Sequence, residues 1–267
     1  MFKRFKKIFL YLSLLFLGSI AGVYLFFPSE LARKYINLNQ DKVIVGKIDL
    51  LFPIGFHFSD VKIHVSEEEE DIKFSEISLY PSLILPITLP FGKSKIKIIA
   101  KTSKTNIQIQ TYLAKDQDKI IMRAIQIGGE IEASDFPINP KIKGKGKVKI
   151  DTELDNINNF ENLSGKIKLF SNRLTLEVSG FDFFEGEITL GETELVANVS
   201  SGKINIIRLE SKGGDIEGMI TGSIKAKKEL SDSEIDLILD LKTKIINLPA
   251  QKFKLQGNIF QPKISSL

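Results

Sequence analysis

The sequence predicts an all-β domain, built on a long, curled, mostly antiparallel sheet, that follows one N-terminal transmembrane helix. Three observations carry this prediction. Residues 8–27 are apolar and uncharged. From Val43 onward apolar and polar residues alternate with a period of two, in short runs separated by Gly, Asn, Asp and Lys. No segment beyond residue 43 carries a sustained helical stripe of apolar residues.

The apolar run Ile8–Phe27 has the length of a membrane span, because twenty helical residues rise about 30 Å. Four basic residues and no acidic residue precede it. These topology-determining residues are Lys3, Arg4, Lys6 and Lys7. Positive charge is retained on the cytoplasmic side of a membrane, so residues 1–7 are expected to be a cytoplasmic tail and the bulk of the chain to lie across the membrane.

A cleaved secretory signal is the alternative interpretation of the same segment. Ser19-Ile20-Ala21 fits a small-x-small cleavage site, which would give a mature chain beginning at Gly22. Val23–Phe27 continue the apolar run beyond that site, which favours an uncleaved anchor. Both interpretations export the body of the protein.

The remainder divides into a short stalk and one β-rich region. Residues 28–42 are expected to form the stalk, with a helix over Pro28–Gln40 in which Leu31, Tyr35 and Leu38 recur at helical spacing. A stalk that turns the chain away from the bilayer is favoured over the alternative, an interfacial helix that lies on the membrane. Residues 43–267 are expected to form the β-rich domain, with a possible internal boundary at the polar link 155–164. At Ser59-Asp60 the apolar residues change from even to odd positions, which predicts a bulge or turn there. The glycine pairs Gly128-Gly129 and Gly213-Gly214 resemble hairpin turns.

The alternation of apolar and polar residues has few exceptions in two runs, Lys141–Leu154 and Asp215–Lys228. One apolar and one solvated face is typical of antiparallel meanders. The apolar positions could form an ordinary sandwich core or line an open groove that holds phospholipid. The candidate lining residues are Ile142, Val148, Ile150, Leu174, Leu176, Val178, Ile216, Ile220 and Ile224.

Composition argues against several classes of function. Residues 1–27 hold four of the 37 basic residues and none of the 33 acidic ones, so residues 28–267 have no net charge (33 against 33). A nucleic-acid binder needs a net basic surface, so nucleic acid is not an expected partner. Cysteine is absent, His57 and His64 lack a third metal ligand, and no G-x-S-x-G elbow occurs. We therefore expect no enzyme, no catalytic or metal site and no cofactor.

Several segments resemble protein N of bacterial type II secretion systems in its long, β-rich form, and more distantly the AsmA/TamB class of inner-membrane proteins. They are LLFPIGFHFSDVKIHV (50–65), IKFSEISLYPSLILPITLPFGKSKI (72–96), Asn162–Gly165, Ile188–Gly191, Gly213–Asp215 and Leu255–Lys263. The resemblance spans most of the chain, and its motifs are degenerate.

The resemblance implies a non-enzymatic, single-pass protein of the bacterial inner membrane, with a periplasmic β domain that contacts other secretion-apparatus proteins in protein transport. The alternative that it implies is an AsmA-like module for lipid binding or lipid transfer. No active-site residue carries over from either family.

Overall fold

The structure is a computed structural model of the 267-residue chain. It describes residues 27–39, 42–52, 55–64, 71–82, 94–116, 119–135, 142–181, 184–225, 227, 233–243, 248–258 and 261–267. Within these ranges no helix is long and apolar enough to cross a bilayer. The expected span, apart from Phe27, and the four basic residues before it lie outside the described residues.

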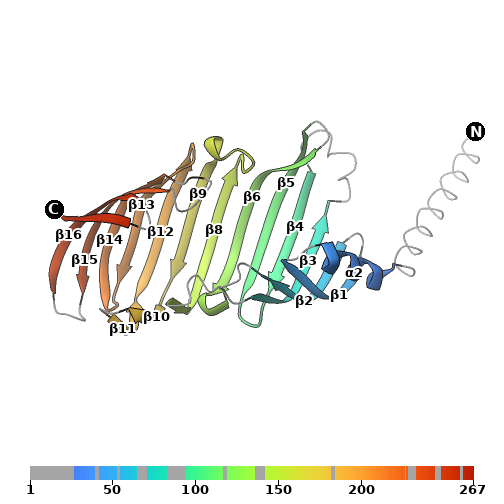
Figure 1. The fold of residues 1–267 in the computed structure, drawn as a ribbon, viewed down its shortest axis with the longest axis horizontal. Coiled ribbons are helices and arrows are strands. Elements are labelled where there is room, and N and C mark those ends of the chain that lie inside the picture. Colours follow the sequence, from blue (N-terminus) through green and yellow to red (C-terminus); the bar gives the residue numbers. More distant parts are fainter. Residues whose placement is uncertain are drawn as a thin grey trace, which may run out of the picture.

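Fourteen strands form one large antiparallel sheet in which each strand pairs with its neighbours in the order β1-β2-β3-β4-β5-β6-β8-β9-β12-β13-β14-β15-β16-β17 (Figure 1). The prediction of a mostly β, antiparallel fold is confirmed. The strands are β1 (Val43–Leu51), β2 (Gly55–Ile63), β3 (Ile72–Pro81), β4 (Ser94–Lys101), β5 (Asn106–Asp116), β6 (Lys119–Glu132), β8 (Lys147–Asp155), β9 (Ser164–Ser171), β12 (Glu192–Ser200), β13 (Lys203–Lys212), β14 (Ile216–Lys225), β15 (Glu234–Thr243), β16 (Leu248–Asn258) and β17 (Gln261–Ser266).

A second, three-stranded sheet, in the order β11-β10-β7, branches from one margin of the large sheet. Its strands are β7 (Ile142–Lys145), β10 (Leu174–Phe181) and β11 (Phe184–Leu190). Each is joined to a strand of the large sheet by one or two residues: β7 to β8, β9 to β10, and β11 to β12. The run expected as one strand, Lys141–Leu154, is therefore broken at Gly146, whose N–H donates to Glu132 Oε1 at 2.6 Å.

The helix expected over Pro28–Gln40 is present as α2 (Ser29–Asn39), and it lies against β1 at one end of the large sheet (Figure 1). Asn37 pairs with the backbone of the edge strand: its Nδ2 donates to Val45 O at 3.1 Å, and Val45 N–H donates to its Oδ1 at 2.9 Å. Arg33 Nη1 donates to Gly46 O at 2.9 Å. These bonds satisfy backbone groups that an edge strand would otherwise present to other chains.

Two short 3₁₀ helices complete the described structure, η2 (Ala133–Asp135) and η3 (Phe160–Asn162). The polar link 155–164 contains η3 and joins β8 to β9. These two strands are paired from Lys149 with Phe170 to Asp155 with Ser164.

A hydrophobic core lies at the α2 end of the large sheet. It consists of Val45, Ile48, Val61, Phe74 and Ala100. Phe27, Ala32 and Ile36 of the N-terminal segment pack against it, with several residues of β1 to β3. The expected irregularity at Ser59-Asp60 is present, because Asp60 has a φ of 53°, Val61 belongs to this core and Phe58 packs against it.

Two glycine pairs that resemble hairpin turns have different outcomes. Gly213-Gly214 lies between β13 and β14, as expected of a turn. Gly128-Gly129 lies inside β6, where the two residues pair with Gln108 and Ile107. The turn prediction at Gly128-Gly129 was wrong because a glycine pair also serves where two strands approach closely. A Cβ on Gly129, whose φ is 136°, would lie 2.3 Å from Asn106 O.

Candidate functional site

The large sheet carries an apolar face that continues from its first strand to its last. One row of directly paired residues crosses all fourteen strands, and twelve of its members have apolar side chains. In order they are Ile48, Phe58, Ile77, Ala100, Ile107, Gly129, Ile150, Leu169, Leu195, Leu209, Ile220, Leu239, Phe253 and Ser266.

A second row repeats the pattern two residues along each strand, or three residues along in β13, where the register shifts between Ile206 and Leu209. It runs through Leu50, Phe56, Leu79, Ile98, Ile109, Ile127, Thr152, Ile167, Ala197, Ile206, Gly222, Leu237, Leu255 and Ile264. Neighbouring strands lie about 4.8 Å apart, so each row is about 60 Å long. We call the surface formed by both rows the apolar face.

Most of the apolar face beyond the core is only half-buried. The side chains of Ile150, Leu169, Leu209 and Leu239, for example, are neither buried nor fully exposed. Among the described residues, the strands do not divide into two facing sheets of similar size, which a sandwich core would require. Within the described residues, the apolar face therefore has no second sheet of similar size, of the kind that normally buries one side of a sheet.

The opposite face of the sheet is charged and its charges are paired. Lys147 donates to Glu130 at 2.6 Å across β6 and β8, and this bond holds the pKa of Glu130 below, and that of Lys147 above, its ordinary value. On the small sheet, hydrogen bonds to Glu187 and then to Glu177 raise the pKa of Lys145. The alternating lysines of the Lys141–Leu154 run are thus solvated: those at 143 and 145 are exposed on the small sheet, and those at 147 and 149 on the large sheet.

The candidate lining residues fall on both sheets. Five lie on the same side of the large sheet as the two rows: Val148 and Ile150 in β8, and Ile216, Ile220 and Ile224 in β14. Of these, Ile150 and Ile220 belong to the first row. Leu174, Leu176 and Val178 lie in β10 of the small sheet, where Val178 pairs with Ile142 of β7. All eight residues of β8, β14 and β10 are half-buried, and the side chain of Ile142 lies outside the described residues.

The sequence reasoning missed more of this surface than it found. Ile107, Leu169, Leu195, Leu209 and Phe253 belong to the same row as Ile150 and Ile220. The signal was present, since each lies in a short alternating run. Finding them required the register between strands, which places the apolar residues of successive hairpins directly opposite one another.

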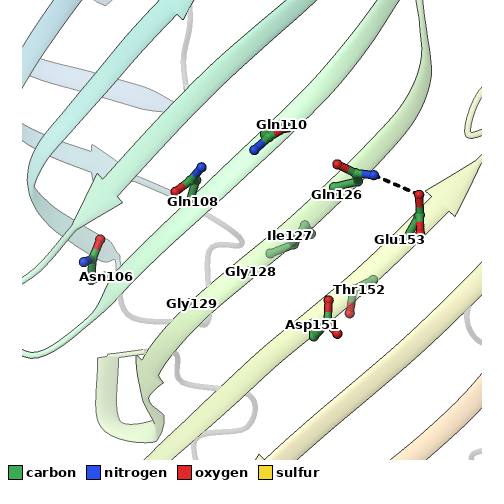
Figure 2. A pocket seen from close by; sticks show the side chains of 10 residues that line it. All are labelled: Asn106, Gln108, Gln110, Gln126, Ile127, Gly128, Gly129, Asp151, Thr152 and Glu153. Atoms are coloured by element: carbon green, nitrogen blue, oxygen red, sulfur yellow. Dashed lines mark hydrogen bonds between the residues drawn. The ribbon is translucent and has the colours of Figure 1, made fainter.

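A shallow polar pocket of about 430 Å³ lies on the charged side of β5, β6 and β8 (Figure 2). It is lined by Asn106, Gln108, Gln110, Gln126, Ile127, Gly128, Gly129, Asp151, Thr152 and Glu153. Amide and carboxylate groups dominate this lining, and Gln126 Nε2 donates to Glu153 Oε1 at 2.8 Å. The pocket offers polar hydrogen-bonding groups and is unsuited to an apolar ligand.

The two histidines do not form a common site. His57 Nδ1 lies 3.0 Å from Ser78 Oγ, whereas His64 Nδ1 lies 2.8 Å from Asp71 Oδ1. Within the described ranges, no three His, Cys, Asp or Glu side chains are grouped so that they could hold a metal ion.

Comparison of the chain with protein-family models, with curated proteins and with solved structures finds no match.

Proposed function

We propose that the chain binds the acyl chains of membrane lipids along the apolar face, which then acts as an open half-barrel or groove for holding or transferring them. The observation that carries the proposal is the pair of aligned apolar rows, which no sheet of similar size faces in the part of the chain that the structure describes. Monomeric soluble proteins rarely expose contiguous apolar patches larger than a few hundred Å², and larger ones mark a site of interaction.

The composition of the apolar face favours an aliphatic ligand. Its central part consists of Ile, Leu, Ala, Gly and one Thr, from Ile150 and Thr152 in β8 to Leu239 in β15. A small-molecule site would carry a few convergent polar groups that orient the ligand. Burial of each CH₂ group contributes about 0.8 kcal/mol, so a long acyl chain gains affinity from length alone.

Photo-crosslinking tests the proposal at neighbouring residues of opposite faces. A benzophenone amino acid at Ile220 or Leu239, on the apolar face, is expected to form phospholipid adducts in cells labelled with radioactive phosphate. The same benzophenone amino acid in place of Met219 or Ile238, on the charged face, should form no phospholipid adducts. Met219 and Ile238 are each 43% exposed, so solvent access favours the control positions. Equal labelling on both faces, or none on either, would overturn the proposal.

A matched pair of charge substitutions measures how far binding depends on the apolar face. Leu239→Glu should reduce the phospholipid that co-purifies with the chain at least several-fold, because an isolated carboxylate is costly to bury against acyl chains. Ile238→Glu introduces the same charge on the other face and should leave the lipid content unchanged.

A role in a type II secretion apparatus is a second proposal, favoured by the free edge of the large sheet. Among the described residues β17 pairs with β16 alone, and Lys263–Leu267 are exposed. Such an edge can accept a strand from another protein. Purification of the full chain from membranes tests this: secretion proteins should co-purify, and secretion that persists after deletion of the gene would exclude the role.

A further inference from the structure

The outer side of α2 carries a stripe of large apolar side chains. Leu31, Tyr35 and Leu38 are 67%, 71% and 80% exposed. A helix turns by about 100° per residue, so these three positions fall within an arc of about 60°. Three large apolar side chains exposed on one side of an 11-residue helix are unusual for a surface that meets only water.

The opposite side of α2 holds the stripe in a fixed orientation. Ala32 and Ile36 pack against the core, and Arg33 and Asn37 make the hydrogen bonds to β1 described above. About 180° of helix rotation separates this packed side from the stripe. The helix therefore packs on the sheet with one side and exposes three large apolar side chains on another.

A further exposed aromatic residue lies near the N-terminal end of α2. Phe52 follows β1, before β2 begins at Gly55, and is 79% exposed. The Phe27 ring lies 6.0 Å from that of Phe56, and Phe56 pairs with Leu50 at the end of β1 that leads to Phe52. The chain therefore enters the fold beside the β1–β2 turn.

We propose that the bilayer surface is the partner of the stripe Leu31, Tyr35 and Leu38, and that Phe52 contacts it as well. The expected span reaches Phe27, and α2 begins at Ser29, within about 7 Å of extended chain. Tyrosine is enriched at membrane interfaces. Lys34, exposed beside the stripe, is placed to reach anionic headgroups. This contact fixes one end of the sheet at the membrane, whether or not the apolar face binds lipid.

Site-directed fluorescence of the full chain in vesicles of phosphatidylcholine and phosphatidylglycerol tests the contact. The chain has no cysteine, so single variants are labelled at one position only. The environment-sensitive dye NBD would be attached to Leu31→Cys, Leu38→Cys and Phe52→Cys. We expect blue-shifted emission, and quenching by nitroxide-labelled acyl chains at least twofold stronger than at control positions.

The controls separate membrane contact from simple proximity to the span. Glu30→Cys lies on α2 about 100° away from Leu31, and Lys263→Cys lies in β17; both positions are exposed. Water-like emission at Leu38→Cys, with quenching equal to that at Lys263→Cys, would overturn the proposal and leave a protein partner for the stripe. Because crosslinking at Leu239 is measured separately, failure of this contact is distinguishable from failure of the lipid-binding proposal.

Discussion

The two ends of the large sheet carry the same apolar pattern in different surroundings. At the α2 end the pattern becomes a core, in which Ile48 is 2% and Val61 3% exposed, because a helix packs over it. From β8 onward the same rows are largely half-buried and no described sheet of comparable size faces them. This difference shows that alternation along a strand determines which face of the sheet is apolar. Whether that face is a core or a binding surface depends on the layer that covers it.

The largest effect on stability is expected when the same kind of truncation is made at each end of the large sheet. Ile48→Ala removes a fully buried side chain and should destabilise β1 to β4 by about 2–5 kcal/mol. Leu239→Ala removes a half-buried one and should cost about 1 kcal/mol or less. Hydrogen exchange of peptides from both ends measures the two effects separately. Equal costs would mean that the apolar face is covered as completely as the core.

Removal of the side chain that joins α2 to the edge strand should have the next largest effect. Asn37→Ala deletes two hydrogen bonds to Val45, and the unsatisfied backbone groups cost about 1–3 kcal/mol. The amides of β1 should then exchange faster, while those of β14 to β16 remain unchanged. Lys34→Ala, on the exposed side of the same helix, is the control and should leave β1 unaffected. Faster exchange at β14 would contradict the independence of the two ends.

The fold class could be predicted from the sequence, whereas the site could be predicted only in part. Alternation of period two is a local property, and from Val43 onward it predicted the β-strands that the structure shows. The register between strands and the branch at Gly146 depend on contacts between segments, which one strand's pattern does not contain. The packing of α2 could not be predicted for the same reason. The spacing of Leu31, Tyr35 and Leu38 indicated a helix, but it did not indicate that the other side of this helix packs on β1.

A smaller effect is expected where the covered end gives way to the open face, at Gly128 and Gly129 of β6. Gly129→Ala places a Cβ 2.3 Å from Asn106 O at a φ of 136°, and should destabilise the sheet by about 1–2 kcal/mol. Gly128→Ala meets only Ile150 O at 3.9 Å, and should be neutral or stabilising by up to about 1 kcal/mol. Denaturant unfolding compares the two variants. Equal destabilisation would mean that strand propensity, not the close approach of β5, selects glycine here.

The smallest effect concerns the charged side of the open region, where Glu130 and Lys147 form an exposed pair. The pKa of Glu130 is lowered by the hydrogen bond from Lys147, so the stabilisation is complete above the carboxyl's unfolded-state pKa and is lost as pH falls through its folded-state pKa. The Tm of Glu130→Gln should therefore be slightly below that of the wild type near neutral pH, and the difference should disappear once the pH has fallen below the folded-state pKa of Glu130. High salt should also remove it, because exposed pairs are screened. A loss for Glu130→Gln that persists at low pH and in high salt would mean that the side chain acts through packing, and that the open region depends on its charged face as the α2 end depends on its core.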